Sequence, residues 1–436
     1  MFNYLEQAWN IDPRLCQLGR EVARQIQPTA EELRQLAAIN QCRILRAFQE
    51  ERVGESDFYP STGYGYNDQG RDKLERIWAK IFGAEAALVR HQIVSGTHSI
   101  ALCLQGILRP GDEFIAANGP PYDTLASVIG HKQVNPGSLK EFGISYKEVP
   151  PLPDNGEPDF EGIRKAINVK TRLVLIQRSR GYSWNPSLSL YQIQQIINVV
   201  KQTKQDIVCL VDNCYGEFTD TKEPNAVGAD LVAGSLIKNP GGGLAPCGGY
   251  IAGKQLLIDL VASRLTAPGI GSEVGASLNL KTHLYQGLFL APHVVGETLI
   301  GAVFTAKLLA NIGFSVSPRA NEKRHDIIQA IKFNNVAQLL AFCQGIQKAS
   351  PVDSMINLEP APMPGYEHKI VMACGSFVQG ASIELSADAP IREPYIAYLQ
   401  GGLTNTHVKV AIMIALQHML DRGKLQLEKK YFFNEK

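Results

Sequence analysis

The chain has 436 residues, and 43 Lys and Arg against 42 Asp and Glu leave a net charge of +1. This balance argues against a nucleic-acid-binding protein that works by bulk positive charge, and against an acidic disordered tail. The eight cysteines are scattered without a C-x-x-C pair, so we expect a reduced, cytoplasmic chain. We expect neither a signal peptide nor a membrane span, because no uncharged apolar run reaches about 18 residues.

Helical periodicity marks the first fifty residues and a later segment. Residues 31–48 carry apolar side chains loosely at helical spacing, and Thr29 is the expected N-cap. The Gly/Tyr-rich residues 60–70 predict an irregular loop. A further helix is predicted from Arg71, with Gly83 as its stop.

Strands and helices then alternate up to about residue 253. The predicted strands are 86–90, 113–117, 172–177, 207–212, 231–237 and 248–253, and the predicted helices are 95–108 and 188–202. Continuous apolar strands between helices favour an α/β fold, with a mostly parallel sheet covered on both faces.

The pattern changes after about residue 300 and predicts a smaller α+β domain. Its predicted strands are 314–318, 326–333, 369–385 and 394–402, and its predicted helices are 334–346 and 407–420. We therefore divide the chain into an N-terminal helical arm (1–52), a large ligand-binding domain (53–295) and a C-terminal small domain (296–436).

The most informative pair of residues is Asp212 and Lys238, which are 238 − 212 = 26 positions apart. Each follows an apolar strand, and ligands bind at the carboxyl edge of open α/β sheets. A carboxylate can hold a protonated ring nitrogen and a lysine can form a Schiff base. These are the two protein groups that pyridoxal phosphate needs. The alternative is a strand-end Asp that caps a turn and a surface Lys.

Residues Ser95, Gly96 and Thr97 follow a strand and begin a helix, where backbone N–H groups can hold an anion such as a phosphate. Ser235 could add a further hydroxyl. The alternative is an ordinary helix N-cap.

Aromatic and basic residues add two weaker signals. Tyr122 follows the strand 113–117 and could stack on a planar cofactor, although a single Tyr more often serves packing. Tyr64, Tyr66 and Arg71 belong to the upstream loop and could bind phosphate, although a solvated loop is the alternative.

Two other kinds of site are excluded. Residues 248–254 match G-x-x-x-x-G-K, but Gln255 replaces the hydroxyl that holds Mg²⁺, and the segment is typical of a strand. The nine histidines show no metal-ligand spacing, so we expect no metal.

A long segment around Lys238 resembles a known family. Residues 230–253, DLVAGSLIKNPGGGLAPCGGYIAG, are similar to the cofactor-lysine segment of the aluminium-resistance or methionine gamma-lyase-like proteins, which are fold-type I pyridoxal phosphate enzymes of cysteine and methionine metabolism. The resemblance covers most of the chain, with further matching segments at 61–75, 90–104, 122–125, 177–188, 264–275 and 378–404.

The resemblance implies a role for each site residue. Lys238 carries the cofactor and moves the substrate Cα proton, Asp212 pairs with the ring nitrogen, and Tyr122 stacks on the ring. The phosphate is held by Ser95, Gly96, Thr97 and Ser235.

Other roles follow from the same resemblance. Asn185 contacts the cofactor's phenolic oxygen. Arg392, or as a second choice Arg180, binds the substrate carboxylate. Tyr64 or Tyr66, together with Arg71, reaches the phosphate of a neighbouring subunit. The active unit would then be a homodimer or homotetramer with shared active sites.

The resemblance implies a pyridoxal 5'-phosphate-dependent carbon–sulfur lyase that performs β- or γ-elimination on a small sulfur amino acid such as methionine, cystathionine or cysteine. Another reaction of the same fold and cofactor (aldolase, racemase or transaminase) stays open. So does a non-catalytic metal-stress protein, which would need clustered ligands that the sequence lacks. We expect no nucleic-acid partner and no membrane.

Overall fold

The computed structural model describes residues 1–131, 135–153, 156–363 and 366–427. The chain folds as two compact units, one made of residues 39–292 and the other of residues 1–38 together with 293–436. Two helices, α3 (Gln27–Glu50) and α10 (Lys281–Asn311), run through the boundaries between the units.

A seven-stranded sheet forms the centre of the unit 39–292, with the strand order β1-β7-β6-β5-β4-β2-β3. The strands are β1 (Ala86–Arg90), β2 (Glu113–Ala117), β3 (Ser145–Val149), β4 (Thr171–Gln177), β5 (Val208–Asp212), β6 (Leu231–Ser235) and β7 (Gly249–Gly253). The pairs from β3 to β6 are parallel, and β7 is antiparallel to both of its neighbours. The predicted α/β fold with a mostly parallel sheet is confirmed.

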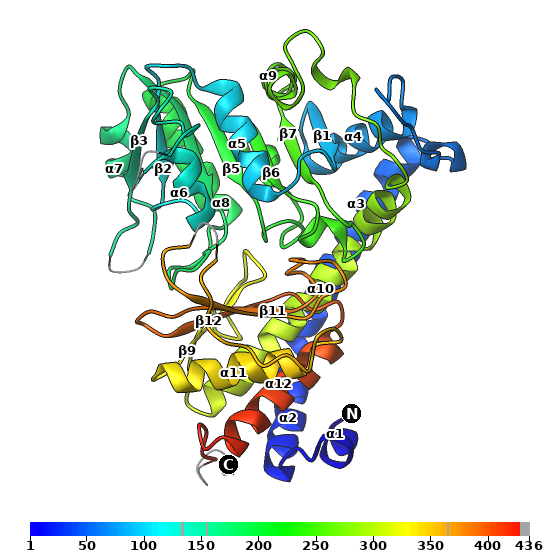
Figure 1. Ribbon diagram of the computed structural model, residues 1–436, viewed down its shortest axis with the longest axis vertical. Helices are drawn as coiled ribbons and strands as arrows, with labels where there is room; N and C mark the ends of the chain where they lie inside the picture. Colours follow the sequence, from blue (N-terminus) through cyan, green and yellow to red (C-terminus); the bar gives the residue numbers. More distant parts are fainter. Residues whose placement is uncertain (132–134, 154–155, 364–365, 428–436) are drawn as a thin grey trace. The chain divides into compact units, whose positions relative to one another are not determined.

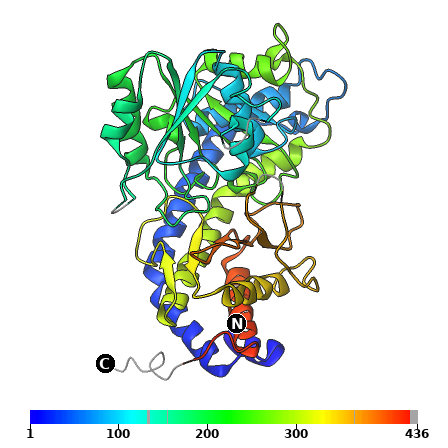
Figure 2. The ribbon, with the colours of Figure 1, turned by 60° about the vertical axis from the view of Figure 1, so that its left-hand side comes forward.

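Helices cover both faces of this sheet, which is why its strands are apolar on both sides. On one face, α5 (Gly96–Ile107) and α9 (Gln255–Leu265) share a core with Leu210 and Ile251. On the other face, α4 (Gln69–Phe82) places Trp78 at 5.2 Å from Tyr250, measured between ring centroids. The views in Figures 1 and 2 show this layering. The remaining elements of the unit are η1 (Glu55–Phe58), α6 (Asp123–Ile129), α7 (Phe160–Ala166), α8 (Leu190–Thr203), η2 (Pro224–Val227), η3 (Asn239–Gly241) and η4 (Gly271–Glu273).

The other unit combines the N-terminal helices with the C-terminal part of the chain. Its antiparallel sheet has the order β10-β11-β12-β9-β8. The elements are α1 (Phe2–Trp9), α2 (Pro13–Gln25), β8 (Ser315–Ser317), β9 (Gln329–Lys332), α11 (Val336–Lys348), β10 (Ile370–Cys374), β11 (Ser386–Pro390), β12 (Ile396–Gln400) and α12 (Asn405–Asp421). Leu15 of α2, Leu339 of α11 and Ile412 of α12 are fully buried in one core.

Two local predictions are wrong. Thr29 is not an N-cap, because α3 begins at Gln27 and contains it; Pro28 is tolerated in the first turn, where a helix has no acceptor for its N–H. The predicted strand 369–385 ends at Cys374, and the chain pairs again only in β11. The sequence SADAP of β11 has poor strand propensity, but all five of its residues are buried between two neighbouring strands.

The helix α10 is long and apolar enough, by length and composition, to cross a membrane. Its most apolar window is 78% buried inside the structure. Such burial is typical of the core helix of a globular protein, because a helix that is apolar on all sides needs protein or lipid around it.

Candidate active site

Asp212 and Lys238 meet at the carboxyl edge of the seven-stranded sheet. Asp212 is the last residue of β5, and it lies beside Ala233 of the neighbouring parallel strand β6. Lys238 follows the end of β6 by three residues. The two side chains interact electrostatically. Two residues 26 positions apart in the sequence therefore lie at the same edge of the sheet.

The surroundings of this pair shift both pKa values upward. Burial raises the pKa of the Asp212 carboxyl, although the positive charge of Lys238 counteracts part of that effect. Burial by itself lowers the pKa of Lys238. The acidic neighbours, first Cys214 and Tyr215, reverse this and raise it above its ordinary value.

The start of α5 lies next to β6. Ser95 is the N-cap, and its Oγ accepts the backbone N–H of His98 at 3.1 Å. A Cβ atom added to Gly96 would lie 3.1 Å from Cys214 Sγ and 3.3 Å from Ser235 Cβ. The first N–H groups of a helix have no acceptor within the helix, and they favour anions. The structure thus brings Gly96, Ser235 and the residues after Asp212 together, as an anion site beside the lysine would require.

Tyr122 lies beside the loop that follows β4. Its backbone N–H donates to Gln177 Oε1 at 2.7 Å, and its ring lies 5.5 Å from that of Tyr182. Asn185 is exposed on the same loop, where its backbone N–H donates to Ser183 Oγ at 3.1 Å. The roles of Tyr122 and Asn185 toward a cofactor stay predictions.

Three further candidate site residues, Arg180, Thr97 and Arg392, lie in different parts of the structure. Arg180 is buried in the loop after β4, whereas Thr97 Oγ1 is hydrogen-bonded to Thr124 Oγ1 at 2.7 Å. Arg392 belongs to the other unit, between β11 and β12. Its choice as the substrate-carboxylate ligand stays a prediction.

In the upstream loop the two tyrosine side chains are exposed to solvent, whereas the arginine side chain is buried and binds the backbone. Tyr64 and Tyr66 are 72% and 59% exposed, and their rings lie 5.5 Å apart. Arg71 is only 5% exposed and donates to the carbonyl oxygens of Gly65 at 2.8 Å and Gly275 at 3.0 Å. In this chain, Arg71 shapes the loop that displays the two tyrosines. A contact with another subunit's phosphate stays a prediction for all three residues.

Sequence reasoning missed the loop that follows Asp212. Tyr215 has a left-handed backbone with φ 71°, and its ring centroid lies 4.0 Å from Lys238 Nζ. Such a backbone is unfavourable for a residue with a Cβ, and it is retained mostly where the surrounding structure demands it. Glu217, two residues later, is completely buried. A signal was available, because both residues lie within five positions of a strand-end aspartate.

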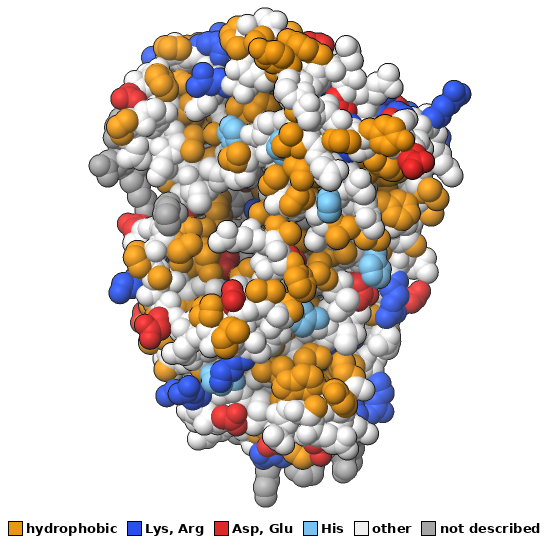
Figure 3. All heavy atoms as spheres, turned by 45° about the vertical axis from the view of Figure 1, so that its right-hand side comes forward, with side chains coloured by type: hydrophobic (Ala, Val, Ile, Leu, Met, Phe, Trp, Pro, Cys, Tyr) orange, Lys and Arg blue, Asp and Glu red, His pale blue; other side chains and the backbone are white. Residues whose placement is uncertain are grey.

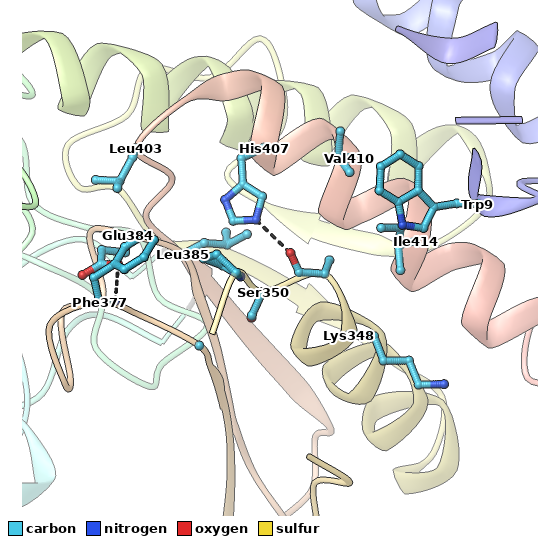
Figure 4. Close-up of a pocket in the computed structure, with 13 residues that line it drawn as sticks. Trp9, Lys348, Ser350, Phe377, Glu384, Leu385, Leu403, His407, Val410 and Ile414 are labelled. Carbon is cyan, nitrogen blue, oxygen red and sulfur yellow. Dashed lines mark hydrogen bonds between the residues drawn. The ribbon is translucent and has the colours of Figure 1, made fainter. Parts of the chain in front are cut away.

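A separate hollow of about 450 Å³ lies in the unit that contains the C-terminal sheet, as Figure 4 shows. Trp9, from α1, is one of its mainly apolar lining residues. Its polar groups are already hydrogen-bonded: Glu384 accepts the backbone N–H of Phe377 at 2.7 Å, and His407 Nε2 lies 2.9 Å from the carbonyl oxygen of Ala349. This hollow therefore offers few polar groups for chemistry.

No group of three or more His, Cys, Asp or Glu side chains that could hold a metal ion occurs among the residues that the structure describes. Around Lys238, the available chemistry consists of an amine, carboxyl groups, a helix N-terminus and aromatic rings.

The fold and the strand-end lysine define the class of fold-type I enzymes. The same fold is found in cystathionine gamma synthase from Xanthomonas oryzae pv. oryzae, with a TM-score of 0.55 and 17% identity over 81% of this chain and 86% of that one.

The chain belongs to the methionine gamma-lyase family, whose profile matches residues 15–420. It is 50% identical over 409 residues to the uncharacterized protein YnbB of Bacillus subtilis (strain 168). The matched region covers 94% of this chain and 97% of YnbB. It is also similar to a carbon–sulfur lyase involved in aluminium resistance from Clostridium novyi NT, with a TM-score of 0.91 and 49% identity over 96% of this chain and 98% of that one. The resemblance seen in the sequence is confirmed.

Proposed function

We propose that this protein is a pyridoxal 5'-phosphate-dependent carbon–sulfur lyase that releases a thiol from a small sulfur amino acid. The observation that carries the proposal is the placement of Lys238 and Asp212 at the same carboxyl edge of the sheet, beside the start of α5. Membership of the methionine gamma-lyase family and the similarity to a named carbon–sulfur lyase support the reaction type.

The residues present fit the cofactor. The amine of Lys238 suits an aldehyde, the buried Asp212 carboxyl suits a protonated ring nitrogen, and the N-terminus of α5 with Ser235 suits a phosphate. Gly96 leaves space at the helix start that a larger side chain would fill. When bound, pyridoxal phosphate supplies an electron sink for the negative charge that develops at the substrate Cα.

Lys238 would hold the cofactor through its amine and, when that amine is free, would accept the Cα proton of the substrate. A lysine that acts as a base near neutral pH needs a lowered pKa, whereas the acidic neighbours raise the pKa of Lys238. A cation held by Asp212 neutralises one of these neighbours, and this lowers the pKa of Lys238 toward the range of a useful base.

The reaction breaks the bond between carbon and sulfur, whose electron pair leaves with the sulfur. The departing thiolate takes a proton and becomes a thiol. Water completes the conversion of the remaining carbon skeleton to a keto acid and ammonia. Lys238, protonated once it has accepted the Cα proton, would be the group that returns this proton.

Replacing Lys238 tests this function. Lys238→Ala should remove the visible absorbance of lysine-bound cofactor and lower thiol release by at least about 1,000-fold, because the residue is both the attachment point and the base. Both quantities are measured with a panel of sulfur amino acids, and the products distinguish elimination from an aldolase, racemase or transaminase reaction.

Lys254→Ala is the matched control. Lys254 is an exposed lysine at the start of α9, paired with Asp230 at 2.6 Å, and its loss should leave both signals unchanged. Thiol release by Lys238→Ala at the rate of the unmodified protein would refute the proposal.

We further propose a homodimer or homotetramer in which Tyr64 and Tyr66 of one subunit reach the site of another. Their exposure, on a loop that Arg71 holds in place, supports this proposal. Figure 3 shows several hydrophobic patches on one face of the molecule, as an assembling surface would have. All eight cysteines are unpaired, which supports a reducing cytoplasmic location.

A further inference from the structure

The ring of Tyr215 lies against the amine of Lys238, and the proposed reaction gives this tyrosine no task. The ring centroid is 4.0 Å from Lys238 Nζ. A cation within about 6 Å of the face of an aromatic ring is attracted to it, and the attraction is stronger where water is excluded. Tyr215 is buried, so the contact is largely shielded from solvent. The proposed cofactor lysine therefore has an aromatic partner at contact distance.

The backbone of Tyr215 has an unfavourable conformation at this point. Its φ of 71° lies in the left-handed region, which a residue with a Cβ rarely adopts. The next residue closes the turn, since the N–H of Gly216 donates to the carbonyl oxygen of Asn213 at 2.8 Å. Such a conformation persists where the surrounding structure imposes it, and it is common at functional sites. The turn thus directs the ring toward the lysine at some cost to the backbone.

Hydrogen bonds on both sides of this tyrosine fix its loop to the segment that carries the lysine. Before it, the N–H of Asn213 donates to the carbonyl oxygen of Ala233 in β6 at 3.0 Å. After it, the carbonyl oxygen of Glu217 accepts the side-chain N–H of Asn239 at 3.0 Å. Asn239 directly follows Lys238 in the sequence. The ring and the amine are therefore held in place by bonds between their own two segments.

We propose that Tyr215 is a positioning residue for Lys238, whose free ammonium group is held by the face of the tyrosine ring at the carboxyl edge of the sheet. The inference rests on the proposed function, in which Lys238 is the amine that holds the cofactor. A lysine side chain is long and flexible, and a charged amine away from water needs a partner. The ring supplies that partner whenever the amine is free.

The free amine has the charge that this contact requires. Burial by itself lowers the pKa of Lys238, but its neighbours, first Cys214 and then Tyr215, raise it above the ordinary value of a lysine. Asp212 and Glu217 also favour the cation. A carboxylate attracts an ammonium group from any direction, whereas a ring attracts it only over its face. The ring therefore adds a direction to the attraction that the acids supply.

Phenylalanines with none to three ring fluorines at position 215 test the proposal. Tyr215→Phe keeps the ring face, and each fluorine withdraws electron density from that face with little change in size. In the cofactor-free full chain, the reactivity of Lys238 toward acetic anhydride at about pH 8 follows its neutral fraction. It should change less than about twofold in Tyr215→Phe and rise stepwise to about fivefold with three fluorines, because the cation loses its attraction to the ring. Mass spectrometry identifies the modified lysine.

Each sample contains its own reference, because Lys254 is an exposed lysine paired with Asp230 at 2.6 Å. The matched control is the same fluorinated series at Phe218, a buried ring of the same loop that also has a left-handed backbone, with φ 61°. This series should leave the reactivity of Lys238 relative to Lys254 unchanged. A packing role for Tyr215 predicts no dependence on fluorine content, and that result overturns the inference. A change in Tyr215→Phe without a further trend would assign the effect to the hydroxyl and overturns it as well.

Nuclear magnetic resonance of the unmodified chain decides the question if the fluorinated variants do not fold. The ε-methylene protons of Lys238, identified by their loss in Lys238→Met, should resonate upfield of those of Lys254, because they lie near the face of a ring. A resonance at the position of an exposed lysine would contradict the contact.

Titration of the same samples with pyridoxal phosphate separates this inference from the proposed function. If the unmodified protein gains no visible absorbance, the proposed function fails, whereas the fluorine series still decides whether the ring holds the amine. If absorbance and thiol release are intact but the reactivity of Lys238 shows no trend, only the inference fails.

Discussion

At the scale of single residues, buried charge is the feature that distinguishes this protein. Asp68 caps α4 by accepting the backbone N–H of Arg71 at 3.0 Å. Its carboxyl also accepts hydrogen bonds from Lys281 and from the hydroxyls of Ser61 and Ser277. One carboxylate thus fastens the loop that carries the exposed tyrosines to the segment before α10.

Asp68→Asn should destabilise the protein by about 3 kcal/mol at neutral pH, because Lys281 then stays buried without its counter-charge. Burial alone would raise the pKa of Asp68, but its hydrogen bonds, first that from Lys281, outweigh burial and lower it. Because the pKa of Asp68 is lower in the folded protein than in the unfolded chain, the ionised carboxyl stabilises the folded protein at every pH above the unfolded-state pKa of about 3.9. This stabilisation is lost as the pH falls through the folded-state pKa.

Urea unfolding checks this prediction at neutral pH and at progressively lower pH. The difference between Asp68→Asn and the unmodified protein should shrink as the medium becomes more acidic than about pH 4. A difference that is independent of pH would show that the carboxylate charge is not the source of the stability.

At the scale of elements, the ends of the strands and the start of α5 build the site. Parallel strands end at one edge, so β5 and β6 bring Asp212 and Lys238 together although 26 residues separate them. The helix α5 returns to the same edge, and its first residue approaches Cys214 and Ser235 closely. Position 96 favours glycine because a side chain there would press against Cys214 and Ser235.

Gly96→Ala should therefore weaken cofactor binding by about tenfold with little loss of stability. The new Cβ meets Cys214 Sγ at 3.1 Å and Ser235 Cβ at 3.3 Å, which pushes the helix start away from Ser235. Titration of cofactor-free protein with pyridoxal phosphate, followed by its visible absorbance, measures the change. Gly111→Ala is a control for the glycine replacement itself, since no atom lies within 4 Å of its added Cβ, although its φ of +92° adds strain. Equal affinities of Gly96→Ala and the unmodified protein for pyridoxal phosphate would contradict an anion site at the start of α5.

At the scale of the whole molecule, the shared-site proposal makes a prediction about mixtures of subunits. Lys238→Ala and a Tyr64→Ala/Tyr66→Ala double variant should each be inactive alone. Mixed under conditions that exchange subunits, they should regain up to about a quarter of the activity, because some sites combine an intact lysine with intact tyrosines.

The measurement is thiol release, with sedimentation of the same samples to establish the assembly. Mixing Lys238→Ala with Lys238→Ala at the same total concentration is the control. If the exchanged mixture stays inactive although mixed oligomers form, the tyrosines do not act across subunits.

Most strands of the seven-stranded sheet were predictable from the sequence, but β3 (Ser145–Val149) was not predicted. Apolar runs such as residues 207–212 form strands wherever both faces are covered, so their burial follows from composition. The helix end at Gly83 was predictable for a similar local reason, because glycine adopts the left-handed backbone, here with φ 70°, at little cost. The segment around Lys238 was specific enough to indicate the family.

The polar groups around Lys238 could not be predicted from the sequence, because they come from segments far apart in the chain. Tyr215 and Glu217 lie close after a strand-end aspartate, but their surroundings depend on strands β6 and β7, which come later in the chain. The strand β11 was hidden for a related reason, because its small residues form a strand only between two partners. Local pattern reports a residue's own preference for helix or strand, whereas burial, charge pairing and close approach depend on neighbours distant in sequence.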